Sequence, residues 1–144
     1  MMQIRQFSAE DEDAVVDLWV ACGLTRPWNN PRLDIERKLR VQPELFLVGE
    51  IDGMIVASAM GGYDGHRGWV NYLAVAPSRR GQGWGRLIMA TVEEALRATG
   101  CPKLNLQVRS DNTAAIAFYE ALGYGSDEVV SLGKRLKTSS LEPE

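Results

Sequence analysis

The feature that most constrains the fold is a succession of strand, glycine-rich loop, helix and strand in the second half of the chain. Apolar residues over 69–75 predict the first strand, and three alternating glycines follow within residues 80–85. Apolar pairs then recur with helical spacing until Gly100 and Pro102 end the helix. A second strand is predicted over 104–108. Two strands joined through a helix lie parallel and side by side, so this segment predicts a βαβ crossover.

The preceding residues predict two helices and an antiparallel hairpin. Ser8 and Asp11 have the spacing of a capping box, and Pro31 suits the first position of a second helix. Asp52-Gly53 separates two apolar runs, which favours a tight hairpin turn because glycine readily adopts a positive φ. The predicted elements of this part are a strand over 3–7, helices over 8–22 and 31–39, and strands over 45–51 and 54–60.

A helix over 112–122 and a last strand between residues 125 and 136 complete the prediction. The expected fold class is mixed α/β, with a central, mostly antiparallel sheet, one parallel βαβ crossover and helices on both faces. A chain of 144 residues has the usual size of one domain. We expect a single domain over residues 1–137 and a flexible tail over residues 138–144.

Composition excludes several classes of function. The formal net charge of −3 and the absence of a basic run longer than two residues argue against nucleic acid as the main partner. Two distant cysteines and one histidine cannot supply the usual ligands of a zinc site. The chain lacks an apolar segment long enough for a signal peptide or a membrane span. We therefore expect a reduced, cytoplasmic protein without a metal and without membrane attachment.

The glycine-rich loop predicts an anion-binding site. Glycine lets the backbone turn tightly and approach a ligand, and the start of the following helix presents unpaired N–H groups with a partial positive charge. Such a junction suits a phosphate or diphosphate. Gly85 is followed by Arg86 and Leu87, which fits neither the phosphate-binding loop of nucleoside triphosphatases nor the dinucleotide fingerprint. A tight turn that binds nothing is the alternative at this stage.

Two motifs resemble the GNAT superfamily, the Gcn5-related N-acetyltransferases. The superfamily's acyl-CoA loop, Arg/Gln-x-x-Gly-x-Gly/Ala, is matched by Arg80, Gly83 and Gly85. Its later motif, Asn-x-x-Ala-x-x-Phe-Tyr-Glu-x-Leu-Gly-Phe/Tyr, is matched over residues 112–124. Further residues, over 26–29, 61–68 and 131–136, resemble a small bacterial branch, the YpeA-like acetyltransferases. Two motifs in the correct order are more specific than either alone.

The resemblance implies a set of acetyl-CoA contacts. The backbone of Leu73, Ala74 and Val75 would bind the pantetheine arm, and Asn112 would donate a hydrogen bond to it. The diphosphate would lie against Arg80, Gly81, Gln82, Gly83, Trp84, Gly85 and Arg86. Backbone N–H groups near Ala74 and Val75 would stabilise the oxyanion, where loss of one donor can cost about 3 kcal/mol of transition-state stabilisation. The alternative is that Leu73 and Val75 serve only as core residues.

The resemblance also implies that Tyr119 is the general acid. Departure of coenzyme A as a thiolate needs a proton, and a phenol with a pKa of about 10 is still protonated at neutral pH and close to a thiol with a pKa of about 8.5. A role in packing alone is the alternative, because Tyr119 has helical spacing with Ala115 and Leu122. Phe118 and Tyr124 are interpreted as packing residues.

The general base stays open. Relatives that acetylate ribosomal-protein N-termini have a glutamate where this chain has Gln107, which cannot accept a proton usefully. Candidates elsewhere are Asp34, Glu36, Asp64 and His66. A base acting through water, or no base at all, also fits the sequence.

The expected function is therefore acetyl-CoA-dependent N-acetyl transfer, without a metal, to a primary amine of a small molecule, peptide or protein. A non-catalytic acyl-CoA-binding sensor or interaction module of the same fold is the alternative, and nucleotide-dependent phosphotransfer is disfavoured by the failed nucleotide motifs. The expected partners are acetyl-CoA and an amine acceptor, and a homodimer is compatible with the resemblance. The acceptor pocket is expected near residues 26–28 and Asp64, between the first two helices and the end of the sheet.

Overall fold

The computed structural model describes residues 1–137, which divide into two compact units, one formed by residues 1–106 and one that begins at Gln107. The tail expected over residues 138–144 lies outside the described residues. The first unit contains the sheet and three helices, and the second contains a short helix and an extended segment.

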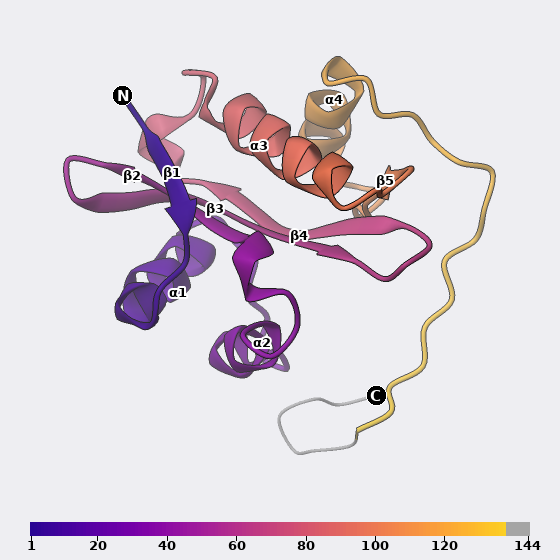
Figure 1. The fold of residues 1–144 in the computed structure, drawn as a ribbon, viewed down its shortest axis with the longest axis horizontal. Helices are drawn as coiled ribbons and strands as arrows, with labels where there is room; N and C mark the ends of the chain where they lie inside the picture. Colours follow the sequence, from indigo (N-terminus) through magenta and orange to yellow (C-terminus); the bar gives the residue numbers. More distant parts are fainter. Residues whose placement is uncertain (138–144) are drawn as a thin grey trace. The chain divides into compact units, whose positions relative to one another are not determined.

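A five-stranded sheet organises the first unit, with its strands in sequence order (Figure 1). The strands are β1 (Gln3–Gln6), β2 (Phe46–Ile51), β3 (Met54–Tyr63), β4 (Gly68–Val75) and β5 (Leu104–Asn105). The first four pair antiparallel, and β4 pairs parallel with β5 through Gly68 with Leu104 and Trp69 with Asn105. The predicted mixed α/β class, with a mostly antiparallel sheet and one parallel crossover, is confirmed.

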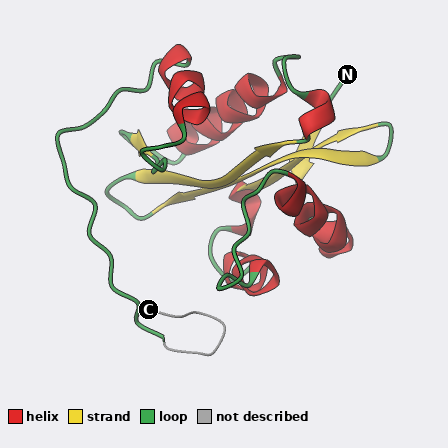
Figure 2. Cartoon of the chain, turned by 180° about the vertical axis from the view of Figure 1, so that it is seen from behind, coloured by secondary structure: helices red, strands yellow, loops and turns green. Residues whose placement is uncertain are grey.

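Helices cover both faces of this sheet (Figures 1 and 2). The helices α1 (Glu12–Ala21) and α2 (Pro31–Lys38) lie on one face, and α3 (Trp84–Ala98) lies on the other. On α3, Ile88, Val92 and Leu96 recur every four residues and are buried, which is the expected apolar stripe of a helix packed on a sheet. Helix α2 begins as predicted, with Pro31 at its first position. The Asn30 side chain accepts a hydrogen bond from the Leu33 amide.

The core beneath α1 and α2 is built on aromatic stacking. Phe7 and Phe46 stack with 4.4 Å between ring centroids, and Trp19 of α1 is fully buried beside them. Val15 and Ile35 are also fully buried and bring the two helices onto the same core. Burial of each such side chain contributes about 2 kcal/mol to folding. The position of α1 and α2 over the sheet is thus set by their apolar faces.

Two predicted strands differ from the structure. The second crossover strand is only Leu104–Asn105, since it pairs with β4 only at Gly68 and Trp69. The last strand, predicted between residues 125 and 136, is wrong: the described residues form no strand there (Figure 2). Apolar residues in that segment, among them Val129, Val130 and Leu132, are at least 78% exposed, so they have no partner surface that would stabilise a strand.

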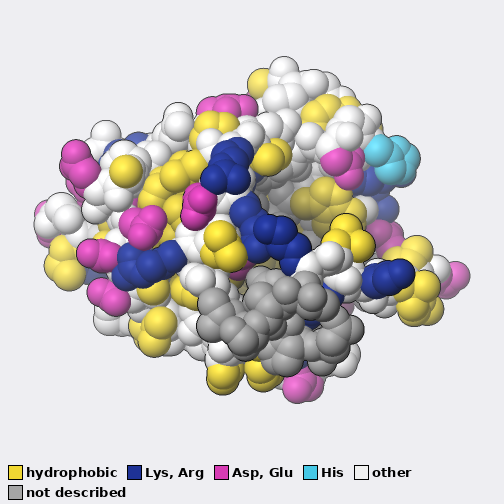
Figure 3. Space-filling model, turned by 90° about the horizontal axis from the view of Figure 1, so that it is seen from below, with side chains coloured by type: hydrophobic (Ala, Val, Ile, Leu, Met, Phe, Trp, Pro, Cys, Tyr) yellow, Lys and Arg dark blue, Asp and Glu magenta, His cyan; other side chains and the backbone are white. Residues whose placement is uncertain are grey.

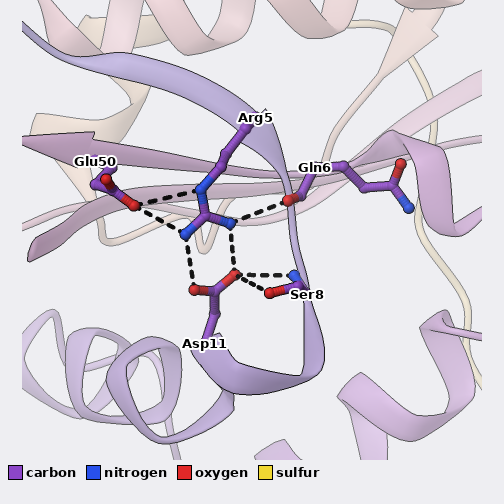
Figure 4. Close-up of polar contacts among 5 residues, drawn as sticks. All are labelled: Arg5, Gln6, Ser8, Asp11 and Glu50. Atoms are coloured by element: carbon purple, nitrogen blue, oxygen red, sulfur yellow. Dashed lines mark hydrogen bonds and ion pairs between the residues drawn. The ribbon is translucent and has the colours of Figure 1, made fainter. Parts of the chain in front are cut away.

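A cluster of charged residues ties β1 to β2 and to the start of α1 (Figure 4). Arg5 donates to both carboxylate oxygens of Asp11 at 2.8 and 2.9 Å and to Glu50 at 2.9 Å. Asp11 also accepts a hydrogen bond from the Ser8 amide at 2.9 Å, which is the capping interaction that the sequence predicted. Asp11 is buried, so its charge is stabilised by these donors rather than by water.

Replacement of Asp11 by asparagine should lower the free energy of unfolding by about 2 kcal/mol at about pH 7, because it removes a charged acceptor of Arg5 and Ser8. The Arg5 hydrogen bond is the main cause that holds the pKa of Asp11 below its ordinary value. A carboxylate with a lowered pKa stabilises the fold above its ordinary pKa of about 4, and this stabilisation is lost as the pH falls through the lowered value.

Chemical denaturation of the wild-type protein and Asp11→Asn should therefore give curves that converge below about pH 4. Glu10→Gln is the matched control, since Glu10 is an exposed carboxylate in the same turn. Equal effects of the two substitutions would contradict this account of the cluster.

Candidate active site

A bulge in β4 shapes the part of the first unit in which predicted site residues gather. Ser58 pairs with Ala74, whereas Met60 pairs with Asn71, so Tyr72 and Leu73 together face the single residue Ala59. Tyr72 has a φ of 53°, the left-handed region that a tyrosine rarely adopts. Such a conformation persists only where neighbouring groups enforce it.

Three interactions hold Tyr72 in this conformation. Ser58 is fully buried, and its hydroxyl donates to the Tyr72 carbonyl oxygen at 2.9 Å. The Trp19 indole in turn donates to the Ser58 hydroxyl at 2.8 Å. The rings of Trp19 and Tyr72 are stacked, with 3.8 Å between their centroids. Both the backbone and the ring of Tyr72 are therefore fixed from the core.

One edge of β4 lacks a neighbouring strand over most of its length within the first unit. Within the first unit, β5 pairs only with Gly68 and Trp69, so the same edge from Val70 to Val75 has no strand partner. Ala74 is buried in the core, and Leu73 and Val75 are half-buried. Backbone groups on an open strand edge can pair with an extended ligand that carries amides. The predicted pantetheine-binding residues thus lie on a suitable edge.

The loop after β4 is built as the sequence predicted for an anion site. Gly81 and Gly83 have φ values of 79° and 85°, and a side chain at either position would meet no heavy atom within 4 Å, so the loop backbone is open to approach. The first bond of α3 runs from the Leu87 amide to the Gly83 carbonyl oxygen at 3.1 Å. The amides of the three residues before Leu87 therefore have no acceptor within the helix and can bind an anion.

Side chains connect this loop to the strand. Arg80 Nε donates to the Val75 carbonyl oxygen at 3.1 Å, which holds the loop at the end of β4. The Trp84 indole donates to the Gln82 side chain at 2.9 Å. Arg80 and Arg86 are exposed and add positive charge beside the free amides. The structure thus brings together every predicted acetyl-CoA contact except Asn112, and their donor set fits a diphosphate.

The other two predicted site residues lie in the second unit, on the helix α4 (Thr113–Ala121) and at its start. Asn112 caps this helix, and its side-chain oxygen accepts from the Ala115 amide at 3.1 Å. Tyr119 makes edge-on contacts with Phe118 and Tyr124, at centroid distances of 5.1 and 5.8 Å. Burial raises the pKa of Tyr119 to about 12, so the phenol keeps its proton at neutral pH.

Most candidates for the general base are engaged elsewhere. The carboxylate of Asp64 accepts hydrogen bonds from two backbone amides of its own turn, and these bonds lower its pKa. Glu36 is exposed and pairs with Arg40 at 2.7 Å. His66 is exposed in the same turn as Asp64. Gln107 donates from its side-chain amide to the Ser131 hydroxyl at 2.6 Å, so it acts as a hydrogen-bond donor there.

Asp34 differs from these candidates because it faces the bulge. The Tyr72 hydroxyl donates to Asp34 Oδ2 at 2.6 Å, which joins α2 to β4. The sequence analysis assigned no role to Tyr72. This tyrosine lies within the apolar run that predicts the strand, so no local pattern distinguishes it as a site residue. Its partner is 38 positions away in the chain. Only the folded arrangement identifies this pair.

Among residues 1–137, no group of three or more His, Cys, Asp or Glu side chains is placed to hold a metal ion. No helix in this part of the chain is both long enough and apolar enough to cross a membrane.

Comparison with known proteins agrees with this geometry. Residues 8–124 match the Acetyltransferase (GNAT) family. A Yersinia pestis protein named acetyltransferase is 53% identical over 135 residues, which cover 94% of this chain and 96% of that protein. Ard1 from Thermoplasma volcanium is structurally similar, with a TM-score of 0.74 and 29% identity over 85% of this chain and 81% of that one. The ribosomal-protein-S18-alanine N-acetyltransferase from Escherichia coli has a TM-score of 0.72 and 25% identity, over 85% and 77% of the two chains. The chain therefore belongs to the acetyltransferase (GNAT) family and is an acyltransferase that uses acetyl-CoA.

Proposed function

We propose that this protein transfers the acetyl group of acetyl-CoA to a primary amine by direct attack, and that residues 1–137 act as one catalytic domain. The observation that carries the proposal is the left-handed glycine loop at the start of the 15-residue helix α3, next to the open edge of β4. Acetyl-CoA combines an amide-bearing arm with a diphosphate. The open strand edge suits the amide-bearing arm, and the cluster of free amides that follows it in the chain suits the diphosphate. The two protein segments thus have the same order as the two parts of the ligand.

In this proposal the main chain supplies most of the binding. Leu73, Ala74 and Val75 pair with the pantetheine arm, and their N–H groups also stabilise the oxyanion. The amides of residues 81–86 bind the diphosphate, with Arg80 and Arg86 as charged neighbours. Asn112 keeps its side-chain oxygen on the helix cap and offers its amide N–H groups to the pantetheine arm.

Tyr119 is the proposed general acid for the departing thiolate. A pKa of about 12 keeps the phenol protonated, but it also makes the phenol a weaker acid than a free tyrosine. Net transfer to a thiolate, whose conjugate acid has a pKa of about 8.5, is therefore uphill unless Tyr119 regains a proton in the same step. The attacking nitrogen must lose a proton as the amide forms, and it can supply that proton.

The acceptor in this proposal is a primary amine of a small molecule, peptide or protein. The name of the Escherichia coli neighbour specifies alanine of a ribosomal protein, which supports a peptide N-terminus as one such acceptor. Gln107 in place of a glutamate argues against an identical arrangement of the base. We also propose a cytoplasmic location, because the free thiols of Cys22 and Cys101 suit a reducing compartment.

Replacement of Gly83 by valine should weaken acetyl-CoA binding by at least about tenfold, because a β-branched residue strains a left-handed backbone and the loop amides would turn away from the ligand. The measurement is the Kd for acetyl-CoA by calorimetry. Gly53→Val is the matched control, since Gly53 has a φ of 80°, equally open surroundings and a place in the β2–β3 turn. Undiminished affinity in Gly83→Val would count against the anion site.

Replacement of Tyr119 by phenylalanine should lower kcat by about a hundredfold and leave the Kd for acetyl-CoA nearly unchanged, because only the proton donor is lost. Thiol release from acetyl-CoA with a panel of amines measures the rate. Tyr124→Phe is the control, since Tyr124 contacts Tyr119 and has no proposed role in proton transfer. Equal rates in the wild-type protein and Tyr119→Phe would remove the acid role.

A further inference from the structure

We propose that the Asp34–Tyr72 pair recognises the acceptor: the hydroxyl oxygen of Tyr72 binds the amine, and Asp34 positions that hydroxyl. This inference rests on the proposed transfer reaction. It assigns a substrate-contacting role to Tyr72 and a positioning role to Asp34.

The first support is the place of Tyr72 in the strand. It directly precedes Leu73, Ala74 and Val75, the proposed contacts of the pantetheine arm, so an amine bound at Tyr72 lies at the same end of β4. The stack on Trp19 and the bond from Ser58 fix the ring and the backbone. A hydroxyl held on such a rigid support keeps its position when the substrate binds, which reduces the entropy lost on binding.

The second support is the direction of the hydrogen bond. A tyrosine hydroxyl has one proton and two lone pairs, and Tyr72 uses its proton toward Asp34 Oδ2 at 2.6 Å. The remaining lone pairs can only accept, so the oxygen selects an N–H donor and rejects a carboxylate. Burial first, and Asp34 second, raise the pKa of Tyr72 above its ordinary value, so this arrangement persists at neutral pH.

The charged side chains of α2 have both signs. Glu36 pairs with Arg40, and Arg32 pairs with Glu12 and Asp13. Arg37 lies 3.4 Å from the other oxygen of Asp34, and the Lys38 ammonium donates to the Gly61 carbonyl oxygen at 2.5 Å. Figure 3 shows side chains of both signs over the face that α1 and α2 cover, rather than a continuous acidic surface.

The proton balance agrees with this role. As the ammonium loses a proton to the Tyr72 oxygen, Tyr72 passes its own proton to Asp34, which releases it to water. The neutral nitrogen then forms the N–C bond as the C–S bond breaks. A second proton leaves the nitrogen and reaches the thiolate through Tyr119. The products are the amide, coenzyme A and one proton.

The test compares Tyr72→Phe and Asp34→Asn with the wild-type protein, using a short peptide with a free N-terminus and spermidine as acceptors. Tyr72→Phe keeps the ring stacked on Trp19 and loses only the hydroxyl. We expect both variants to raise KM for the peptide by about tenfold or more, with the Kd for acetyl-CoA unchanged. Asp34→Glu should restore part of the loss.

Glu36→Gln is the matched control, since it removes an exposed carboxylate from the same helix and should leave the peptide kinetics unchanged. Thermal unfolding of each variant shows whether the fold is kept. Calorimetric binding of the peptide in the presence of coenzyme A shows whether the contact with the acceptor is lost. If the wild-type protein acetylates either amine and both variants retain the KM for that amine, this inference is overturned and the proposed function stands. If the wild-type protein binds acetyl-CoA but acetylates no amine, both fall.

Discussion

The candidate site depends on one strained residue, Tyr72, whose left-handed backbone makes the bulge in β4. A left-handed conformation at a bulky residue costs about 1–3 kcal/mol, so the surrounding core must enforce it. Trp19 and Ser58 do so through a buried chain of two hydrogen bonds and an aromatic stack. Within the first unit β5 pairs only with Gly68 and Trp69, so the edge at Leu73–Val75, which directly follows Tyr72, has no strand partner. The packing of α1 against the sheet therefore fixes the backbone that precedes this open edge.

The proposed anion site illustrates why net charge is a poor guide to small-ligand binding. The chain is acidic overall, yet the loop before α3 presents amides that have no acceptor within the helix and lies beside two exposed arginines. Helix amides and the helix dipole act over a few ångströms, whereas distant surface charges are screened by salt.

Two tyrosines with raised pKa values have different surroundings. Tyr72 lies beside a carboxylate, which fixes its proton and leaves an acceptor oxygen. Tyr119 contacts the edges of two aromatic rings, and burial alone raises its pKa. The two phenols therefore have different proposed roles: Tyr72 binds the acceptor amine, and Tyr119 protonates the thiolate.

The sequence by itself determined the features that depend on neighbouring residues. The glycine spacing of the loop, the Pro31 start of α2 and the capping contact of Asp11 with Ser8 each involve backbone conformations within a few positions, so their patterns are readable in the chain. The mixed sheet followed from the order of these elements, because a helix between two strands permits only a parallel crossover of one hand.

Tertiary structure alone decided the rest. The pairing of Asp34 with Tyr72, the contact of Arg5 with Glu50 and the shortening of β5 depend on which distant segments meet and in which register. The strand predicted near the C-terminus failed for the same reason: an apolar run becomes a strand only where another strand offers its backbone groups. Local patterns specify conformations, but contacts between distant residues depend on how the whole core packs.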